Sequence, residues 1–197
     1  MSITKLRIGL FGGGFDPIHV GHLLLAETAR QEAGLDKVIF MPTGISPHRC
    51  GKTCYKVDAE HRYQMLLQAT NNYSEYEVSR YEIDNKQKSY TVDTLQHLIS
   101  TNSNANLYLI LGGDMYLDLP NWYKVEEILQ LTTPIVAARP NYVFGQQIPE
   151  NHIQIKMPQL EISSTTSRQN VSTGKSIRFQ VTKEVEKYIL ENGLYKT

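Results

Sequence analysis

Short apolar runs alternate along the chain with longer segments in which apolar residues recur at helical spacing. Short apolar runs bounded by glycine or proline are typical of buried strands, and amphipathic segments are typical of helices. The predicted strands are residues 6–11, 38–41, 76–83, 107–111, 134–138 and 152–157. The predicted helices are residues 23–33, 58–70, 91–99, 119–131 (with a break expected near Pro120) and 181–191, together with a short helix capped by Ser163.

This alternation predicts an α/β fold with a parallel sheet that helices cover on both faces. No internal repeat, low-complexity tract or linker divides the sequence, so residues 1–197 are expected to form a single domain. Its last part, from about residue 160 to 197, is expected to be a small helical subregion. Because two predicted strands end in glycine pairs, a ligand is expected at the carboxyl edge of the sheet.

The balance of basic and acidic residues excludes a strong overall electrostatic field around the protein. The chain has 20 basic and 20 acidic residues and is 41% apolar, as in ordinary globular proteins, so it has no net attraction to nucleic acid or membranes. No apolar run approaches the ~20 residues of a membrane span, and the N-terminal apolar stretch is too short for a signal peptide. We therefore expect a cytoplasmic protein that binds anions only at local sites.

The segment between the first predicted strand and the first predicted helix carries the clearest chemistry. It reads Gly-Gly-Gly-Phe-Asp-Pro-Ile-His-Val-Gly-His over residues 12–22. Residues without side chains let a phosphate approach backbone N–H groups, and the start of the following helix favours the same anion. His19 and His22 are three residues apart, so both rings can face one anion. These features predict phosphate binding at this strand–helix junction.

Better-known phosphate-binding motifs do not fit the sequence. The dinucleotide-binding pattern needs a third glycine where Pro17 stands, and no acidic residue clearly ends the second predicted strand. The Gly-Lys-Thr and Gly-Lys-Ser triplets at residues 51–53 and 174–176 both lack the earlier glycine that a P-loop requires. The predicted phosphate site therefore belongs to a different class.

The two cysteines of the chain lie in a polar segment, residues 45–57, that is predicted to be a loop. Cys50 and Cys54 are near His48 and His61, but their spacing matches none of the usual zinc patterns. A loop with two incidental thiols is therefore the favoured interpretation, and a metal site is the alternative to it.

Residues 12–23 resemble the His-x-Gly-His signature of the nucleotidyltransferase superfamily, and in particular that of bacterial nicotinate-nucleotide adenylyltransferases. Further matches to this family follow in order along nearly the whole chain, although each alone is weak. They are Pro47-His48-Arg49, Ser89-Tyr90-Thr91 with Asp93-Thr94, Gly112-Gly113-Asp114 followed by Trp122, Arg139-Pro140, residues 162–168 and residues 191–195. The resemblance implies the Rossmann-like nucleotidyltransferase fold.

Three residues depart from the pattern of the family that the chain resembles. Gly14 stands where the family usually has threonine, Gly113 where it usually has alanine or serine, and Ser167 where it usually has isoleucine. The first change could remove a hydroxyl contact to a substrate phosphate. The other two are expected to alter packing only.

The resemblance implies adenylyl transfer from ATP to nicotinate mononucleotide, which yields nicotinate adenine dinucleotide and pyrophosphate in NAD biosynthesis. A mononucleotide phosphate, with a second pKa near ~6, can attack the α-phosphorus directly, so no protein nucleophile is needed. Mg²⁺ would arrive with ATP and take its ligands from substrate phosphates rather than from protein side chains. The implied partners are these two nucleotides, without nucleic acid or a membrane, and a homodimer is possible.

The same resemblance assigns residues to each substrate. His19, His22 and Arg168 would be catalytic, because they would hold phosphates as charge moves to the leaving pyrophosphate. The ATP-binding residues would be Gly12, Gly13, Phe15, His19, His22, Gly112, Asp114, Arg139, Ser163, Ser164, Thr165 and Arg168. The mononucleotide would be bound by Gly14, His48, Arg49, Thr91, Trp122 and Tyr123, with the Trp122 ring stacked on the pyridine.

Three other functions fit parts of the same pattern. A preference for nicotinamide mononucleotide depends on how the ring substituent is received, and the sequence leaves it open. Pantetheine-phosphate adenylyltransferases share the glycine and histidine features, but they normally carry threonine where His19 stands and lack the Ser-Tyr-Thr block. A nucleotide-sensing module that binds without turnover is less consistent with the full set of phosphate ligands.

Overall fold

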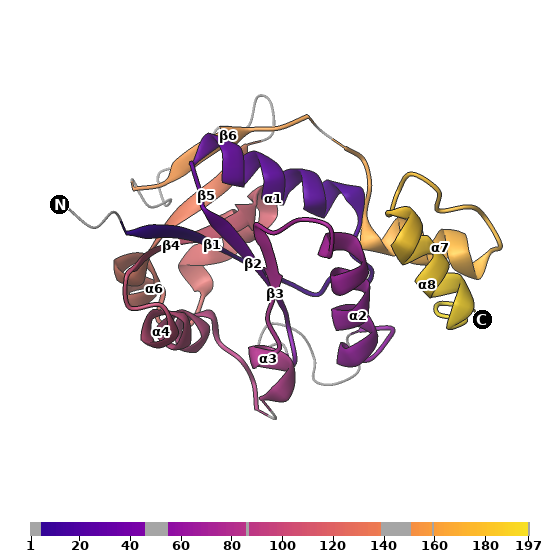
Figure 1. Ribbon diagram of the computed structural model, residues 1–197, viewed down its shortest axis with the longest axis horizontal. Coiled ribbons are helices and arrows are strands. Elements are labelled where there is room, and N and C mark those ends of the chain that lie inside the picture. The colour runs from indigo at the N-terminus through magenta and orange to yellow at the C-terminus, as the bar shows by residue number, and fades with distance from the viewer. Residues whose placement is uncertain (1–4, 46–54, 86, 139–150, 159, 197) are drawn as a thin grey trace.

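The structure is a computed structural model that describes residues 5–45, 55–85, 87–138, 151–158 and 160–196. Within these ranges helices pack on a six-stranded sheet (Figure 1). The strands are β1 (Leu6–Gly13), β2 (Lys37–Pro42), β3 (Tyr76–Val78), β4 (Ala105–Gly112), β5 (Thr132–Ala138) and β6 (Ile153–Lys156). The helices are α1 (Val20–Glu32), α2 (Ala59–Thr70), α3 (Tyr81–Asp84), α4 (Thr91–Thr101), α5 (Gly113–Asp118), a 3₁₀ helix (Leu119–Asn121), α6 (Val125–Leu131), α7 (Ser164–Ser172) and α8 (Lys183–Glu191).

The strands lie in the order β3-β2-β1-β4-β5-β6, and each neighbouring pair is parallel. This is the strand order of a doubly wound, Rossmann-like sheet, so the predicted fold class is confirmed. The two halves of the sheet meet where β1 pairs with β4, with Leu6 opposite Ala105 and Leu10 opposite Leu109. Sheets of this kind bind ligands beyond the carboxyl ends of the strands at that crossover.

Helices cover both faces of the sheet (Figure 1). Successive side chains of a strand point to opposite faces, so an apolar strand presents an apolar surface on each face for helices to bury. On β4, Tyr108 and Ile110 belong to one core cluster, whereas Leu107, Leu109 and Leu111 belong to the other. Helices α1, α2 and α8 bury apolar side chains in the first cluster, and α4, α5 and α6 do so in the second. A strand buried on both faces needs apolar residues at every position, which explains the continuous apolar runs of the sequence.

Helices α7 and α8 lie together at one end of the molecule, and α8 contacts α2 (Figure 1). Their side chains Val171, Val185 and Ile189 are buried in the same core cluster as α1 and α2. The start of α7 lies beside the segment between β1 and α1, where Ser164 Oγ donates a hydrogen bond to Pro17 O over 2.9 Å. The C-terminal helices thereby bring a second helix N-terminus to the carboxyl edge of the sheet.

The prediction of one strand over residues 76–83 is wrong in its second half. The strand β3 ends at Val78, and the helix α3 follows it. The Glu82 carboxylate is buried and accepts a hydrogen bond from Thr94 Oγ1 over 2.8 Å. This contact between distant residues holds the short helix against α4, and a local sequence pattern contains no sign of it.

Two predicted helices differ most from their predicted limits. Helix α1 begins at Val20, three residues before the predicted start, because His19 caps it. The predicted helix 119–131 is broken, as expected near Pro120, into the 3₁₀ helix and α6, which are separated by a left-handed Lys124 with φ of 54°. Helix α5 was not predicted. No helix in the described part of the chain is long and apolar enough to cross a membrane.

Candidate active site at the carboxyl ends of β1 and β4

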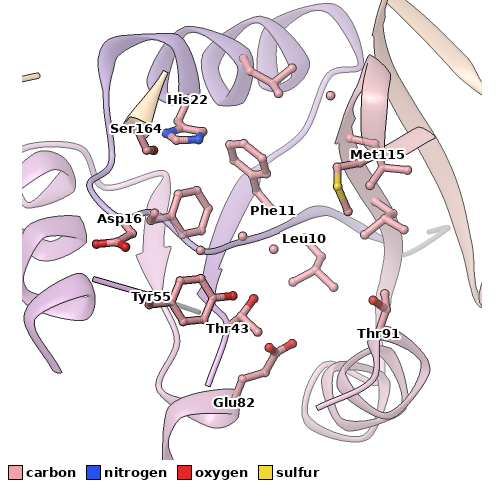
Figure 2. A pocket seen from close by; sticks show the side chains of 18 of the residues that line it. Leu10, Phe11, Asp16, His22, Thr43, Tyr55, Glu82, Thr91, Met115 and Ser164 are labelled. Atoms are coloured by element: carbon pink, nitrogen blue, oxygen red, sulfur yellow. The ribbon is translucent and has the colours of Figure 1, made fainter. Parts of the chain in front are cut away.

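A cavity of about 490 Å³ opens where β1 and β4 end, at the crossover of the sheet. Figure 2 shows Ser164 beside the His22 ring at one end of this cavity, and Glu82 and Thr91 toward the other end. The cavity brings together most of the residues that the resemblance assigned to substrates. These are Gly12, Gly13, Gly14, Phe15, His22, Thr91, Gly112, Trp122, Ser164, Thr165 and Arg168.

Gly12 and Gly112 leave bare backbone at the ends of the two central strands. A Cβ at either position would meet no atom within 4 Å, so both positions open onto free space. Backbone without side chains lets a phosphate or a base come close to N–H groups. The sequence places these glycines at two neighbouring strand ends, and the fold turns them into one ligand-accessible surface.

Phe15 holds the segment after the glycines in a tight conformation. Its φ of 47° lies in the left-handed region, which is costly for a residue with a bulky side chain. Its ring is buried and packs edge-on against Phe11 and His22, with centroids 5.3 and 5.2 Å away. This aromatic packing offsets the backbone strain and fixes the direction of the His22 ring.

His19 and His22 cap helix α1 reciprocally. His19 is the N-cap residue, and its Nδ1 accepts a hydrogen bond from His22 N over 3.3 Å. His22 Nδ1 accepts one from His19 N over 3.2 Å, and the two rings stack with centroids 3.6 Å apart. Because each Nδ1 is an acceptor, a neutral ring must carry its proton on Nε2.

Burial keeps both rings neutral at physiological pH. It lowers the pKa of His19 to about 4. The pKa of His22 falls well below its usual value of 6.5, because of burial and then because of the charge that a protonated His19 would carry. His22 lines the cavity, whereas His19 lies behind it as the stacked, buried partner. The site therefore offers an Nε2–H donor from His22, supported by His19, rather than a pair of cations.

Asp16 is the centre of a hydrogen-bond network that the sequence did not predict. Its side chain is buried and accepts hydrogen bonds from Lys56 N over 2.7 Å and from Tyr195 Oη over 2.7 Å. Burial is the main cause that raises the pKa of Tyr195, so this hydroxyl stays protonated and donates. The available sequence signal was an acidic residue inside the predicted phosphate-binding segment, because its carboxylate needs partners that hold it away from an anion.

The same network positions Arg168 on helix α7. Arg168 Nη1 donates to the backbone oxygen of Asp16 over 2.7 Å and lies 3.9 Å from Asp16 Oδ2. Its Nη2 donates to Thr165 Oγ1 over 3.2 Å. Ser163 caps the helix by accepting a hydrogen bond from Thr166 N over 3.1 Å. A cation and a helix N-terminus thus face the cavity opposite the start of α1, which suits an anion between them.

Glu82, Ser89, Thr91 and Trp122 form the other end of the cavity. Burial raises the pKa of Glu82 to about 7, although the hydrogen bond from Thr94 Oγ1 opposes this effect. Ser89 Oγ is buried and has no hydrogen-bond partner among the described residues. This end combines an aromatic ring with polar groups, and Glu82 was not singled out from the sequence because it lay in a predicted strand.

Comparisons with known proteins agree with this geometry. The model of the cytidylyltransferase-like family matches residues 10–170. A relative from Moorella thermoacetica, named "Probable nicotinate-nucleotide adenylyltransferase", is 42% identical over 96% of this chain and 92% of its own length. A relative of the same name from Enterococcus faecalis is 38% identical over 98% of this chain and 86% of its own length. The chain belongs to the nicotinate-nucleotide adenylyltransferase family.

Solved structures with a known ligand share the fold of this chain. The Plasmodium falciparum nicotinic acid mononucleotide adenylyltransferase complexed with NaAD matches with a TM-score of 0.78 at 19% identity, covering 96% of this chain and 97% of that chain. The same enzyme complexed with APC matches with a TM-score of 0.75 at 21% identity and the same coverage. At such identities the likeness concerns the fold, and it agrees with the predicted nucleotidyltransferase fold.

Not every residue assigned from the family resemblance lines the cavity. His19 is buried behind the residues that do, Ser163 is exposed at the N-cap of α7, and Asp114 is exposed at the start of α5. Tyr123 is 52% exposed, and its ring packs on that of Tyr90 at 4.6 Å. The remaining assigned residues, His48, Arg49 and Arg139, lie outside the described residues.

The described residues contain no group of three or more histidine, cysteine, aspartate or glutamate side chains arranged to hold a metal ion. Of the alternative zinc site, His48, Cys50 and Cys54 lie outside the described residues. His61 is described, and its Nδ1 lies 3.0 Å from Tyr188 Oη in a hydrogen bond. His61 therefore links α2 to α8.

Proposed function

We propose that this chain transfers the AMP part of ATP to nicotinate mononucleotide, which forms nicotinate adenine dinucleotide and releases pyrophosphate in NAD biosynthesis. One observation carries the proposal. Two helix N-termini, that of α1 with His22 and that of α7 with Arg168, meet at one end of a cavity whose other end holds an aromatic ring. Such a cavity suits two phosphate-bearing substrates placed end to end.

The reaction needs positioning rather than a protein nucleophile. The mononucleotide phosphate, largely dianionic above its second pKa of ~6, would attack the α-phosphorus of ATP in line with the leaving pyrophosphate. His22 Nε2–H and the Arg168 guanidinium would donate hydrogen bonds to phosphate oxygens as negative charge moves onto the pyrophosphate. The neutral state of His22 fits this role, since a donor is required and no proton has to be transferred.

Each substrate would occupy one side of the crossover. ATP would lie against the bare backbone at Gly12 and Gly112 and reach the start of α7 at Ser164 and Thr165. The pyridine of the mononucleotide would stack on Trp122, near the N-terminus of α4 at Thr91. The polar groups at this end fit a ring that carries a small polar substituent.

Mg²⁺ is proposed to enter as the complex with ATP. The phosphates of ATP would supply most of its ligands, because Mg²⁺ is usually bound through substrate phosphates and a few carboxylates. When bound, the ion neutralises the charge that develops on the leaving pyrophosphate. The proposed location of the reaction is the cytoplasm.

The experiment that tests the proposal is pyrophosphate release from ATP and Mg²⁺, with nicotinate mononucleotide and nicotinamide mononucleotide compared side by side. We expect turnover with nicotinate mononucleotide, and a lower kcat/KM with the amide. Turnover with neither mononucleotide would refute the proposal, and binding without turnover would favour the sensing module instead. A higher kcat/KM with the amide would reassign the substrate while leaving the reaction type in place.

A further inference from the structure

Tyr55 occupies the space that a side chain at position 14 would need. A Cβ on Gly14 would lie 2.6 Å from Tyr55 Cε1 and 3.4 Å from Cδ1, and the shorter of these distances is a severe overlap. The threonine that the family usually carries at this position would therefore displace the ring. The Tyr55 ring thus fills the space that a side chain on Gly14 would occupy.

Arg62 fixes this ring against the glycine loop. Its guanidinium lies over the Tyr55 ring, with Cζ 4.0 Å from the ring centroid. Nη1 donates to Gly14 O over 2.9 Å, and Nη2 donates to Thr43 O over 2.7 Å. The side chain of Arg62 is 1% exposed, so neither hydrogen bond competes with bulk water. One buried cation thus ties the ring to the backbone of position 14.

The ring stands in the path between the two proposed substrates. Tyr55 lines the cavity, and Figure 2 shows it between His22 on one side and Glu82 on the other, with its hydroxyl pointing into the cavity on the side of Thr43. His22 belongs to the end proposed for the ATP phosphates. The phosphate of the mononucleotide has to reach that end from the pyridine site, so it passes close to the hydroxyl.

We propose that Tyr55 is a mononucleotide-binding residue whose hydroxyl donates a hydrogen bond to the substrate phosphate, in place of the hydroxyl that threonine would supply at position 14. This inference rests on the proposed function and deepens it. Two physical features support the role. A phenolic hydroxyl can donate a charge-assisted hydrogen bond to a phosphate oxygen, and the Arg62 guanidinium over the ring holds the ring in place for it.

The buried Arg62 guanidinium favours an anion at the same place. Arg62 hydrogen-bonds only neutral carbonyl oxygens in the described part of the chain, and its Nε has no hydrogen-bond partner there. The carboxylates of Asp16, Asp58 and Glu82 act on this charge without a direct ion pair to it among these residues. The low dielectric around a buried group extends the field of the guanidinium toward the cavity. A ring that only filled space would not need the hydroxyl.

The first test removes only the hydroxyl. We expect Tyr55→Phe to raise KM for nicotinate mononucleotide about tenfold, as for the loss of one hydrogen bond to a charged group, while KM for ATP stays within about twofold. Tyr73→Phe removes a hydroxyl from a ring that is 54% exposed and does not line the cavity, and it should behave as the wild type. An unchanged KM for the mononucleotide in Tyr55→Phe would overturn the inference.

A second test exchanges the two hydroxyls. Gly14→Thr alone should weaken mononucleotide binding, because the new side chain collides with the ring. Tyr55→Ala alone should weaken it as well, because the donor is lost. The double variant Gly14→Thr/Tyr55→Ala should return KM to within about threefold of wild type, an energy gap well below that of one charged hydrogen bond. A double variant no better than Tyr55→Ala would contradict the exchange.

The phosphate can be separated from the rest of the substrate with nicotinate riboside, which lacks it, used as a competitive inhibitor. Tyr55→Phe should leave the inhibition constant of the riboside unchanged, and an equal loss for riboside and mononucleotide would refute the phosphate contact. Thermal unfolding of each variant checks that the fold is intact. Wild-type turnover is measured in the same assay, so failure of the proposed function would show in the wild type, and failure of this inference only in the variants.

Discussion

His19 and His22 each satisfy the backbone N–H group of the other with Nδ1, and their rings stack at 3.6 Å. One arrangement thus caps helix α1, fixes the tautomer of both rings and leaves the Nε2–H of each as a donor. His22, which helps to start the helix, is therefore also the residue that lines the cavity and is proposed to hold a phosphate. Stability and activity are coupled at this point, and the two effects have to be measured separately.

For His22→Ala we expect kcat to fall by about 10²–10³, the range observed when one donor to a transition state is removed. The change also removes half of the reciprocal cap, so a smaller loss of stability, on the order of 1 kcal/mol, is expected. Steady-state kinetics and urea unfolding at pH 7.5 separate the two effects. A kcat within threefold of the wild type would exclude the phosphate role of His22.

His19 makes stability fall in mild acid. Its pKa is about 4 in the folded protein and 6.5 in the unfolded chain, so the unfolded state binds more protons between these values. The contribution of His19 to the free energy of unfolding is fully present above pH 6.5 and is lost as the pH falls toward 4. His19→Asn keeps a capping acceptor without titrating. We expect the difference in unfolding free energy between wild type and variant to shrink from pH 7 to pH 4.5, and a constant difference would contradict the buried, neutral ring.

Trp122→Ala tests the pyridine end of the cavity. The indole is 8% exposed and lines the cavity, so its removal leaves the proposed pyridine site without a stacking surface. We expect KM for the mononucleotide to rise at least tenfold while KM for ATP changes little. Trp122→Phe retains an aromatic face and should recover most of the affinity. Equal increases in both KM values would argue for a general packing role of the ring.

Glu82 should make mononucleotide binding depend on pH. Its pKa of about 7 means that the carboxyl is mostly neutral below pH 7 and ionised above it, where it repels an anionic substrate in the same cavity. Unit charges about 8 Å apart repel by about 2 kcal/mol at an effective dielectric constant of about 20. We expect KM for nicotinate mononucleotide to rise severalfold from pH 6.5 to 8.5 in the wild type.

Glu82→Gln provides the matched comparison, because glutamine can still accept the hydrogen bond from Thr94 Oγ1 but does not ionise. Its KM for the mononucleotide should be nearly independent of pH over the same interval. The substrate phosphate is already ionised there, so it contributes little to any change. Parallel pH profiles for wild type and variant would show that the Glu82 carboxyl does not act on this substrate.

Gly44 and Gly112 should respond in opposite ways to the same substitution. A Cβ on Gly44 would lie 2.0 Å from the backbone oxygen of Glu82, so Gly44→Ala must move backbone and should cost about 2 kcal/mol or more. A Cβ on Gly112 meets nothing within 4 Å, so Gly112→Ala should fold normally but raise KM for ATP. Urea unfolding and kinetics distinguish these outcomes, and a stable Gly44→Ala protein would contradict the close approach.

The sequence predicted the parallel sheet well because strands buried on both faces consist of continuous apolar runs. It also located the cavity, since the glycines at the ends of β1 and β4 are visible as letters and parallel strands bring their carboxyl ends to one edge. These predictions depend on local composition and on one general rule of sheet topology. The roles of the individual residues in the cavity remain proposals.

Other features could not be predicted because they depend on contacts between distant residues. Asp16 accepts its hydrogen bonds from Lys56 and Tyr195, which are 40 and 179 residues away. The helix α3 is held by the contact of Glu82 with Thr94, and no local pattern separates it from a strand. The fit of Tyr55 over Gly14 likewise appears only when the loop and the ring are placed in space.

The hydrogen bond from Tyr195 to Asp16 has a consequence for how the protein is made. During translation, residues 12–22 leave the ribosome long before Tyr195, which lies 179 residues after the Asp16 carboxylate that it holds. The loop of residues 12–22 therefore lacks this hydrogen bond until Tyr195 has been added to the chain. A polypeptide that stalls or is cut before residue 195 would carry the motif without its support, so nucleotide binding by this protein would report that synthesis had proceeded past this residue.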